Sequence, residues 1–473
     1  MKVQLPIKGK VFQNVDDIEL VGNLSPYLMD GSVDDMLCVR RRPGLDLWVD
    51  LGTGAPIDGL YWNPVFNCMF AVSNGHMFKI SDIAGTNADV TVDTLNAGTR
   101  VSFAHDLTYQ LAANGGRIVY YLNVGMTTYI ADADAPTTVT QLAFLDNYIL
   151  ADSINTGRFY WCDVGDPSSW NAASYATAEA KADNLTALRT SIDEIFLGGN
   201  LSLEVWGNDG LTPFSRLQGS AIDRGVSAKY SMVDADNSWF FIDNESKFVR
   251  LSGRTAKAVS SCFDTLWSTF SGVSSVQANH ISIGSNDFIT LHFTNEARTF
   301  VYDIKHDDWS EWAYWNSVAA TYEDFLCRTY TYSPAWNMHV MGSRIDGKLY
   351  TLSSTVYDDN SNPIRTARRT AHLDHGTNEE KRCNGITIKM KRGVGIAGSA
   401  DTPYVMMRFR DDGSSIWSNE YWISLGLVGA TEWLGWLMQP LGTYRSRQWE
   451  FVVSDAVPFT LISVEEDVDI LGV

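Results

Sequence analysis

The sequence lacks the apolar segments that membrane insertion and secretion require. No stretch approaches the ~18 consecutive apolar residues of a membrane-spanning helix. Met1–Gln4 is followed by polar residues, where a signal peptide would have its apolar core. We therefore expect no membrane span, no secretory leader and synthesis in the cytoplasm.

Positive charge is also scarce. The chain has 36 Lys and Arg against 56 Asp and Glu, which gives a formal net charge of −20. A general nucleic-acid binder needs a basic surface that displaces the counterions of the phosphates. The charge balance therefore argues against tight, extensive DNA contact. It does not exclude DNA nearby, because an acidic wall repels a duplex and lets it slide.

Sequence signatures of catalysis and metal binding are missing as well. The six cysteines include no C-x-x-C pair, which favours reduced, packed thiols over disulfides or zinc. No G-x-S-x-G, H-E-x-x-H or phosphate-loop motif occurs, and no spacing singles out a pair of catalytic carboxylates. His372, Asp374 and His375 supply half a metal site, whereas a metal needs three or four converging ligands. We predict no catalytic, cofactor or metal site and no enzyme activity.

Apolar and aromatic residues, in contrast, are abundant. Hydrophobic residues make up 45% of the 473 positions and aromatics 12%, including 16 Trp. That is ample for a buried core and too apolar for a disordered chain. The length predicts either one large repeated domain or two domains.

A repeating unit organises most of the chain: an apolar strand, a tight turn and a second apolar strand. The turns fall near positions 74, 114, 155, 199, 244, 295 and 346, at intervals of 40 to 51 residues. Several are Asn-Gly or Asp-Gly, which supply the positive φ of two-residue hairpins. This spacing is typical of β-propeller blades and predicts six or seven of them. Leu45–Leu51 is placed to close the ring by pairing near Leu349–Leu352, and Tyr175–Asp183 is the one helix candidate.

The rhythm changes after the repeats. From 381 onward six alternating strands follow without the period, which fits a β-sandwich. We predict an all-β chain with the following parts: an N-terminal arm (1–36) that packs on the C-terminal domain or on a neighbouring subunit, a propeller (37–358), a linker (359–380) and a sandwich (381–473).

Three stretches are candidates for contact with partners. Arg40, Arg41 and Arg42 form a basic run that could contact phosphate, lie in a solvated turn or make salt bridges between subunits. Trp309 and Trp312 could anchor a protein or a carbohydrate, or could wedge between blades. The long polar excursion Gly207–Tyr230 joins two hairpins and exceeds an ordinary connection, which suggests a working surface.

The stretch Leu185–Leu251, which contains this excursion and the hairpins on both sides of it, carries a family resemblance. The matching residues are Leu203-Glu204-Val205-Trp206, Pro213-Phe214-x-Arg216, Gly219-x-x-Ile222-Asp223-x-Gly225-x-x-Ala228, Asp236 and Trp239-Phe240, whereas Arg224-Gly225-Val226 departs from the family pattern. Thr299-Phe300-Val301-Tyr302 with Trp309-x-x-Trp312, and Phe409 to Trp417, continue it toward the C-terminus. With these motifs in this order along the sequence, the chain resembles the packaged-DNA stabilisation proteins of short-tailed bacteriophages, which are tail hub or nozzle proteins.

The resemblance implies a structural virion protein of the phage tail. It implies a homo-hexamer between the portal–adaptor ring and the tail needle, spike or fibres, with double-stranded DNA passing through a channel without specific binding. The protein-contact residues that we derive from it and from the stretches above are Arg40, Arg41, Arg42, Pro213, Phe214, Arg216, Asp223, Arg224, Trp309 and Trp312. Two alternatives stay open: a propeller adhesin that binds glycans through Trp309 and Trp312, and a propeller glycosidase.

Overall fold

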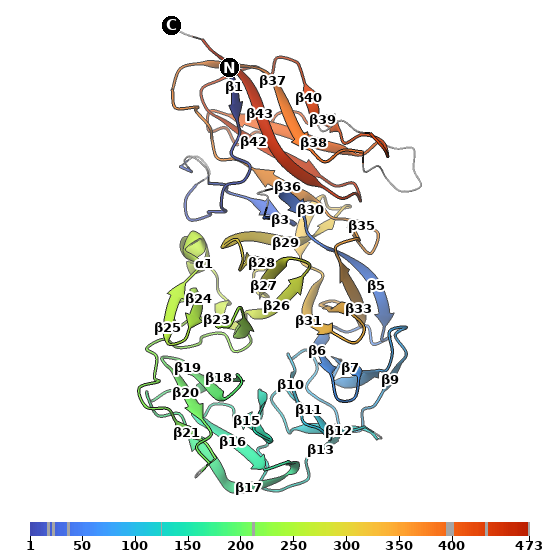
Figure 1. The fold of residues 1–473 in the computed structure, drawn as a ribbon, viewed down its shortest axis with the longest axis vertical. Helices are drawn as coiled ribbons and strands as arrows, with labels where there is room; N and C mark the ends of the chain where they lie inside the picture. Colours follow the sequence, from blue (N-terminus) through green and yellow to red (C-terminus); the bar gives the residue numbers. More distant parts are fainter. Residues whose placement is uncertain are drawn as a thin grey trace.

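The computed structural model describes residues 1–16, 19–20, 24–35, 38–123, 125–210, 213–393, 402–430 and 434–471. Nearly all regular structure in this part of the chain is β-strand. A wheel of small sheets forms one end of the molecule and a two-sheet sandwich the other (Figure 1). The sandwich stands against the rim of the wheel and does not lie over its axis. The predicted β-propeller followed by a C-terminal sandwich is confirmed.

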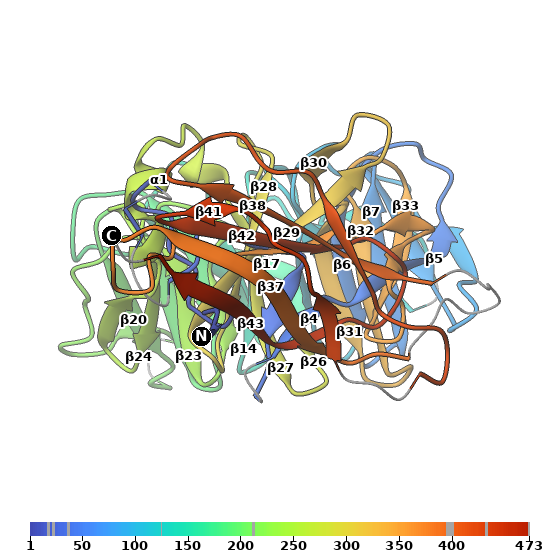
Figure 2. The same cartoon turned by 90° about the horizontal axis from the view of Figure 1, so that it is seen from above.

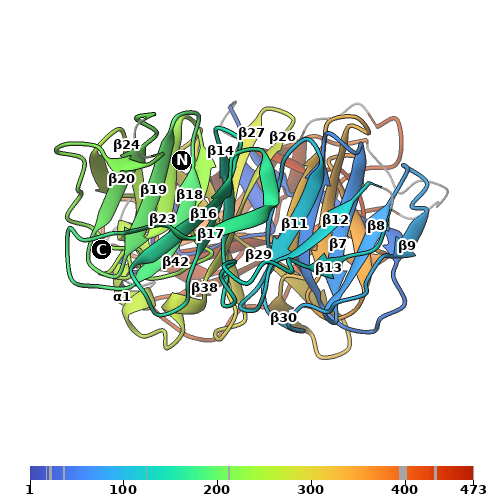
Figure 3. The ribbon, with the colours of Figure 1, turned by 90° about the horizontal axis from the view of Figure 1, so that it is seen from below.

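Six blades of the wheel are antiparallel four-stranded units of consecutive strands within the described ranges. The first blade consists of β6 (Ile57–Asn63), β7 (Cys68–Ser73), β8 (His76–Ile80) and β9 (Asn87–Asp89). The second consists of β10 (Ser102–His105), β11 (Tyr109–Ala113), β12 (Val119–Leu122) and β13 (Thr128–Tyr129). The third consists of β14 (Leu142–Leu145), β15 (Tyr148–Asp152), β16 (Arg158–Asp163) and β17 (Asp166–Thr177). The fourth blade consists of β18 (Leu185–Thr190), β19 (Glu194–Gly199), β20 (Leu203–Gly207) and β21 (Ser215–Arg216). The fifth consists of β22 (Val233–Ala235), β23 (Ser238–Ile242), β24 (Phe248–Ser252) and β25 (Thr255–Ala258). The sixth consists of β26 (Gln277–Ile283), β27 (Asn286–Phe293), β28 (Arg298–Asp303) and β29 (Asp308–Asn316). Figure 3 shows the blades of the first half from below.

A further four-stranded unit closes the ring and draws on both ends of the propeller sequence. It contains β31 (Cys327–Ser333), β32 (Met338–Ser343), β33 (Lys348–Ser353) and, from the N-terminal side, β5 (Gly44–Asp50). Leu352 pairs with Leu45 and Leu349 with Val49. The predicted closure is confirmed, and it means that the wheel cannot open without separating β5 from β33.

The hairpins form where the sequence supplies turn residues. Asn74 and Gly75 have φ values of 53° and 79°, Gly115 has 108° and Asn155 has 58°. Glycine and asparagine adopt this left-handed backbone most readily, so each turn reverses the chain in few residues. Apolar side chains of successive blades then pack against each other. Trp239 and Phe241, for example, share a core with Leu203 and Val205 of the preceding blade.

The sandwich consists of two sheets. One contains β1 (Lys2–Gln4), β3 (Gly31–Val33), β4 (Val39–Arg41), β37 (Lys381–Met390), β40 (Leu434–Leu437), β41 (Thr443–Tyr444) and β43 (Thr460–Ile470). The other contains β2 (Leu28–Met29), β36 (Thr366–Arg369), β42 (Arg447–Val453), β38 (Tyr404–Asp411) and β39 (Tyr421–Ser424). Seen from above, β37 and β43 run across the end of the molecule (Figure 2).

The second sandwich sheet is continuous with the sixth blade. Met29 of β2 pairs in parallel with Glu311 of β29, and Leu28 pairs antiparallel with Arg368 of β36. The segment expected to be a linker thus contains a sheet strand, β36, and residues from the N-terminal arm join the propeller to the sandwich. Backbone hydrogen bonds therefore run from one part to the other.

Remaining elements are small. They are β30 (Thr321–Asp324), β34 (Asp358–Asp359), β35 (Asn362–Pro363), α1 (Asp264–Ser268) and two 3-10 turns, Ser261–Phe263 and Val273–Ser275. The helix predicted over Tyr175–Asp183 is absent: Tyr175 and Thr177 belong to β17 and pair with Tyr160 and Arg158. Pairing with the neighbouring strand outweighs the helix preference of the alanines.

No helix in the described ranges is long and apolar enough to cross a membrane. None of the six cysteines, all of which lie in the described ranges, forms a disulfide.

Candidate interaction surfaces

The arginine run of the sequence lies at the joint between propeller and sandwich. Arg42 is completely buried, and its guanidinium lies between two buried carboxylates. Nε donates to Oδ1 of Asp30 at 2.6 Å, and Nη2 donates to Oδ2 of Asp359 at 2.6 Å. Nη2 also reaches the carbonyl of Ala313, in the sixth blade, at 2.9 Å. Arg42 thus links the arm, the sixth blade and the segment that follows the closing strands.

The two neighbouring arginines have different surroundings. Arg41 is buried and donates to the carbonyls of Val453 and Val457, at 2.9 and 3.0 Å, so it fastens β4 to the sandwich. Arg40 points the other way, is paired with Asp34 and keeps 51% of its side chain exposed. Of the three, Arg40 is therefore the one that a partner can reach.

The long excursion after β20 is a packed connection with an exposed rim. Phe214 is buried among Tyr148, Phe159 and Trp161. Gly225 passes so close to the preceding hairpin that an added Cβ would lie 2.0 Å from the carbonyl oxygen of Asn200.

Four other predicted contact residues of this excursion keep some surface. Pro213 is half-buried, Arg216 is exposed, and Asp223 is exposed and paired with Lys181. Arg224 is partly exposed and donates to Asp243 at 2.7 Å. The rim that a partner can touch is therefore Arg216, Asp223 and part of Arg224.

Both tryptophans near the sixth blade are buried. Trp309 is 4% exposed, packs among Phe248, Phe263 and Trp267, and donates from Nε1 to the carbonyl of Val259 at 3.0 Å. Trp312 is 1% exposed and lies against Phe288 and Phe325. Neither offers surface to a glycan or a protein, and their burial fits the interpretation of wedges between blades.

An exposed apolar surface lies at one edge of the sandwich, where sequence reasoning did not place one. Strands β39 and β40 end their respective sheets within the described ranges. Trp422 on β39 is 58% exposed and Met438, just after β40, is 72% exposed. Leu427, Val428 and Leu434 are also exposed. The signal available in the sequence was a Trp and several aliphatic residues in short strands next to glycine-rich turns. We call Trp422, Leu427, Val428, Leu434 and Met438 the sandwich edge.

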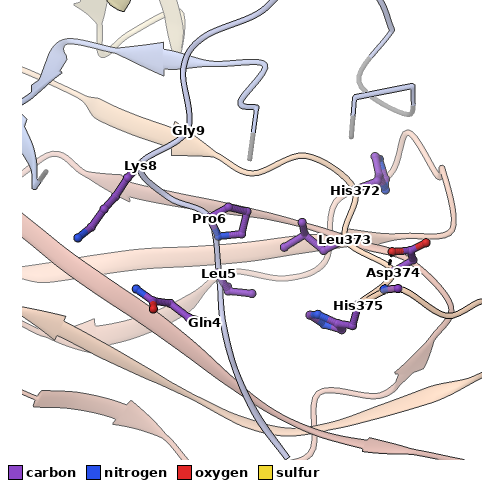
Figure 4. A pocket seen from close by; sticks show the side chains of 10 residues that line it. Gln4, Leu5, Pro6, Lys8, Gly9, His372, Leu373, Asp374 and His375 are labelled. Carbon is purple, nitrogen blue, oxygen red and sulfur yellow. Dashed lines mark hydrogen bonds between the residues drawn. The ribbon is translucent and has the colours of Figure 1, made fainter. Parts of the chain in front are cut away.

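A cavity of about 500 Å³ lies between the N-terminal segment and residues 372–376 (Figure 4). Leu5, Pro6 and Leu373 line it together with polar groups of Lys8 and Asp374. His375, behind it, lies 3.3 Å from Glu466 and 3.1 Å from the hydroxyl of Tyr444. Across the described ranges, no group of three His, Cys, Asp or Glu residues could hold a metal. The cavity therefore marks the seam between the arm and the sandwich.

Comparison with known proteins agrees with this architecture. The model of the phage stabilisation family described as "Bacteriophage P22 Gp10, beta-propeller" matches residues 3–357. No curated protein matches the chain.

Three solved structures with a similar fold are distant in sequence. The computationally designed Ika8 protein is 13% identical (TM-score 0.39) over 66% of this chain and 100% of its own. A chain of the Mitotic Checkpoint Complex is 12% identical (TM-score 0.39) over 70% of this chain and 95% of its own. YCF48 bound to D1 peptide is 12% identical (TM-score 0.42) over 66% of this chain and 97% of its own. These values are too low to support a statement about function. The match over residues 3–357 is what assigns the chain: it belongs to the phage stabilisation family of the bacteriophage P22 Gp10 β-propeller type.

Proposed function

We propose that the chain is a structural subunit of a phage tail hub or nozzle. In this role it docks below the portal–adaptor ring, retains the packaged DNA and forms part of the conduit through which the DNA leaves. The observation that carries the proposal is the family match over three quarters of the chain, from the arm through the closing blade. The needle, spike or fibres of the tail would contact the opposite side.

The acidity of the chain suits a conduit. With a net charge of −20, the surface repels the phosphates of a passing duplex. Screening limits this effect to about 8 Å at physiological salt, so only charges that line the channel act on the DNA. Weak, repulsive contact allows DNA to slide, whereas a basic channel would hold it.

The sandwich edge is our candidate for contact between copies of the chain. Two strand edges lie there side by side, and open strand edges readily pair with another chain. Exposed Trp and Met are the residue types enriched in the buried centres of protein interfaces. A ring of identical subunits, a hexamer in our proposal, would cover this surface on every copy.

Assembly of matched variants tests the proposal. Trp422→Lys places a charge on the sandwich edge, and Ile192→Lys places the same charge on an exposed propeller loop. Native mass spectrometry with the cognate adaptor should give a ring for the wild-type chain and for Ile192→Lys, and smaller species for Trp422→Lys. A wild-type chain that stays monomeric beside its adaptor would contradict the proposed function. A ring that survives Trp422→Lys would contradict the assigned contact.

A further inference from the structure

A second cavity lies at the centre of the wheel. It measures about 480 Å³ and is lined by residues from the first strands of six blades, β6, β10, β18, β22, β26 and β31, or from positions directly beside them. Figure 1 shows β6, β10, β18, β26 and β31 on the inner side of their blades, next to the axis. Side chains from remote parts of the sequence, such as Arg100, Arg189 and Asn279, therefore meet there.

Two arginines in this cavity are held by neutral acceptors. Nη2 of Arg100 donates to Oδ1 of Asn279 at 3.0 Å, and its Nη1 donates to the carbonyl of Arg328 at 3.0 Å. Nη1 of Arg189 donates to Oε1 of Gln141 at 2.6 Å and to the carbonyl of Leu188 at 2.8 Å. Within the described ranges neither guanidinium has a carboxylate within 4.0 Å.

Several other charged groups lie near the two arginines. Arg328 pairs with Asp58 at 3.2 Å, and Lys229 donates to Thr140 at 2.7 Å. The nearby carboxylates are those of Asp58, Asp152 and Asp234, the last of which lines the cavity. Among the described residues that line the cavity itself, two arginines, Arg100 and Arg189, accompany one carboxylate, that of Asp234, in a chain whose net charge is −20.

Burial is the main cause of two lowered pKa values beside the cavity, and nearby positive charges add to it. Burial, followed by the charges of Arg100, Arg328 and Arg344, lowers the pKa of His292 to about 3. Burial also lowers the pKa of Arg100 to about 10, and the charges of Arg328 and Arg189 act in the same direction. Both arginines are partly exposed, so the cavity is open to water and to a small ion. An anion between the two arginines would supply the missing partner.

We propose that the axial cavity binds one small oxyanion, of the size of inorganic phosphate, between the guanidinium groups of Arg100 and Arg189. A guanidinium offers planar, parallel N–H donors that match the oxygen atoms of a phosphate or a carboxylate. Arg100 precedes β10 and Arg189 lies on β18, so the anion would connect the second and fourth blades across the axis. It would thereby stabilise the wheel in proportion to its occupancy.

Thermal unfolding of the full chain tests the site. Sodium phosphate should raise the melting temperature in a saturable way relative to sodium chloride of equal ionic strength. Sodium acetate in a parallel series shows whether a carboxylate suffices. Arg100→Gln and Arg189→Gln should each weaken the apparent affinity about tenfold or more, since a charge-assisted contact is lost. The control variant Arg382→Gln replaces an exposed arginine of the sandwich and should leave the apparent affinity for the anion unchanged. The proposal is overturned if neither anion gives a saturable rise, or if both cavity variants keep the wild-type response.

A structure of the wild-type chain with selenate provides a readout that needs no variant. The anomalous signal of selenium should appear within hydrogen-bonding distance of both guanidinium groups. Selenate bound only on the outer surface would overturn the proposal, whether or not the variants fold.

Discussion

The guanidinium of Arg42 is enclosed by Asp30, Asp359 and the carbonyl of Ala313, at a point where three parts of the chain meet. Removing one partner of a buried ion pair strands the remaining charges without water, which typically costs about 3–5 kcal/mol. We expect Arg42→Ala to lower the free energy of unfolding by that amount in chemical denaturation. Arg40→Ala, two positions earlier, removes an exposed pair and should cost less than about 1 kcal/mol. Equal losses for both variants would contradict the assigned joint.

His306 ties the arm to the sixth blade in a pH-dependent way. Its Nδ1 faces Asp303 at 2.8 Å and its Nε2 faces Asp35 at 3.0 Å, so both nitrogens must carry protons to donate. Burial lowers the pKa of His306, but the hydrogen bonds and charges of the two carboxylates together outweigh it, and the pKa is raised above 6.5. A group whose pKa is higher in the folded than in the unfolded state contributes its full stabilisation of the fold when the pH lies below its unfolded-state pKa. This contribution disappears as the pH rises through its folded-state pKa.

His306→Gln should therefore cost more stability in acid than in base. Chemical denaturation of the wild type and the variant at about pH 5.5 and about pH 9 measures the difference between their free energies of unfolding at each pH. We expect a larger loss at the lower pH. The same loss at both values would mean that the imidazole contributes packing alone.

Residue-level environments were the hardest feature to predict from the sequence. Arg40, Arg41 and Arg42 are chemically identical and adjacent, yet Arg40 is exposed and the other two are buried. Strand alternation separates neighbours, but only the partner strands decide which side faces the core. For Trp309 and Trp312 the sequence allowed an exposed anchor but favoured a wedge between blades, which is where both lie.

At the scale of single elements, β5 closes the wheel. Leu45 on this strand is fully buried beside Leu352, and Leu47 on the same strand is 41% exposed. We expect Leu45→Ala to cost about 2–5 kcal/mol of unfolding free energy, as truncations of buried leucines do. Leu47→Ala should stay within about 0.5 kcal/mol, as exposed sites do. Urea denaturation of both variants measures this, and a small effect of Leu45→Ala would mean that the β5–β33 seam contributes little.

Elements with strong local signals were predictable. Asn-Gly turns placed the early hairpins, and the spacing of the repeats placed the closing strand, because both signals are local or periodic. The bridge formed by β2 was not predictable, since a two-residue strand with one parallel pair to β29 leaves no pattern in the sequence. The helix expected over Tyr175–Asp183 failed for a related reason: the pairing of Tyr175 and Thr177 with β16 is a tertiary contact.

At the scale of the whole molecule, a wheel carries a sandwich on its rim. A continuous sheet through β29, β2 and β36 connects the two parts. The acidic wheel and the apolar sandwich edge then have separate roles in our account: one faces DNA or solvent, and the other faces neighbouring copies. The family match fixes the phage stabilisation family, whereas the stoichiometry and the neighbours of the ring remain our proposal.

Retention of packaged DNA is the central claim, and nuclease protection measures it most directly. Heads are filled with DNA and assembled with the portal and adaptor, with or without this chain, and are then treated with nuclease. The account predicts that the genome stays full-length and nuclease-resistant when the chain is present and escapes when it is omitted. Equal protection in both preparations would contradict it.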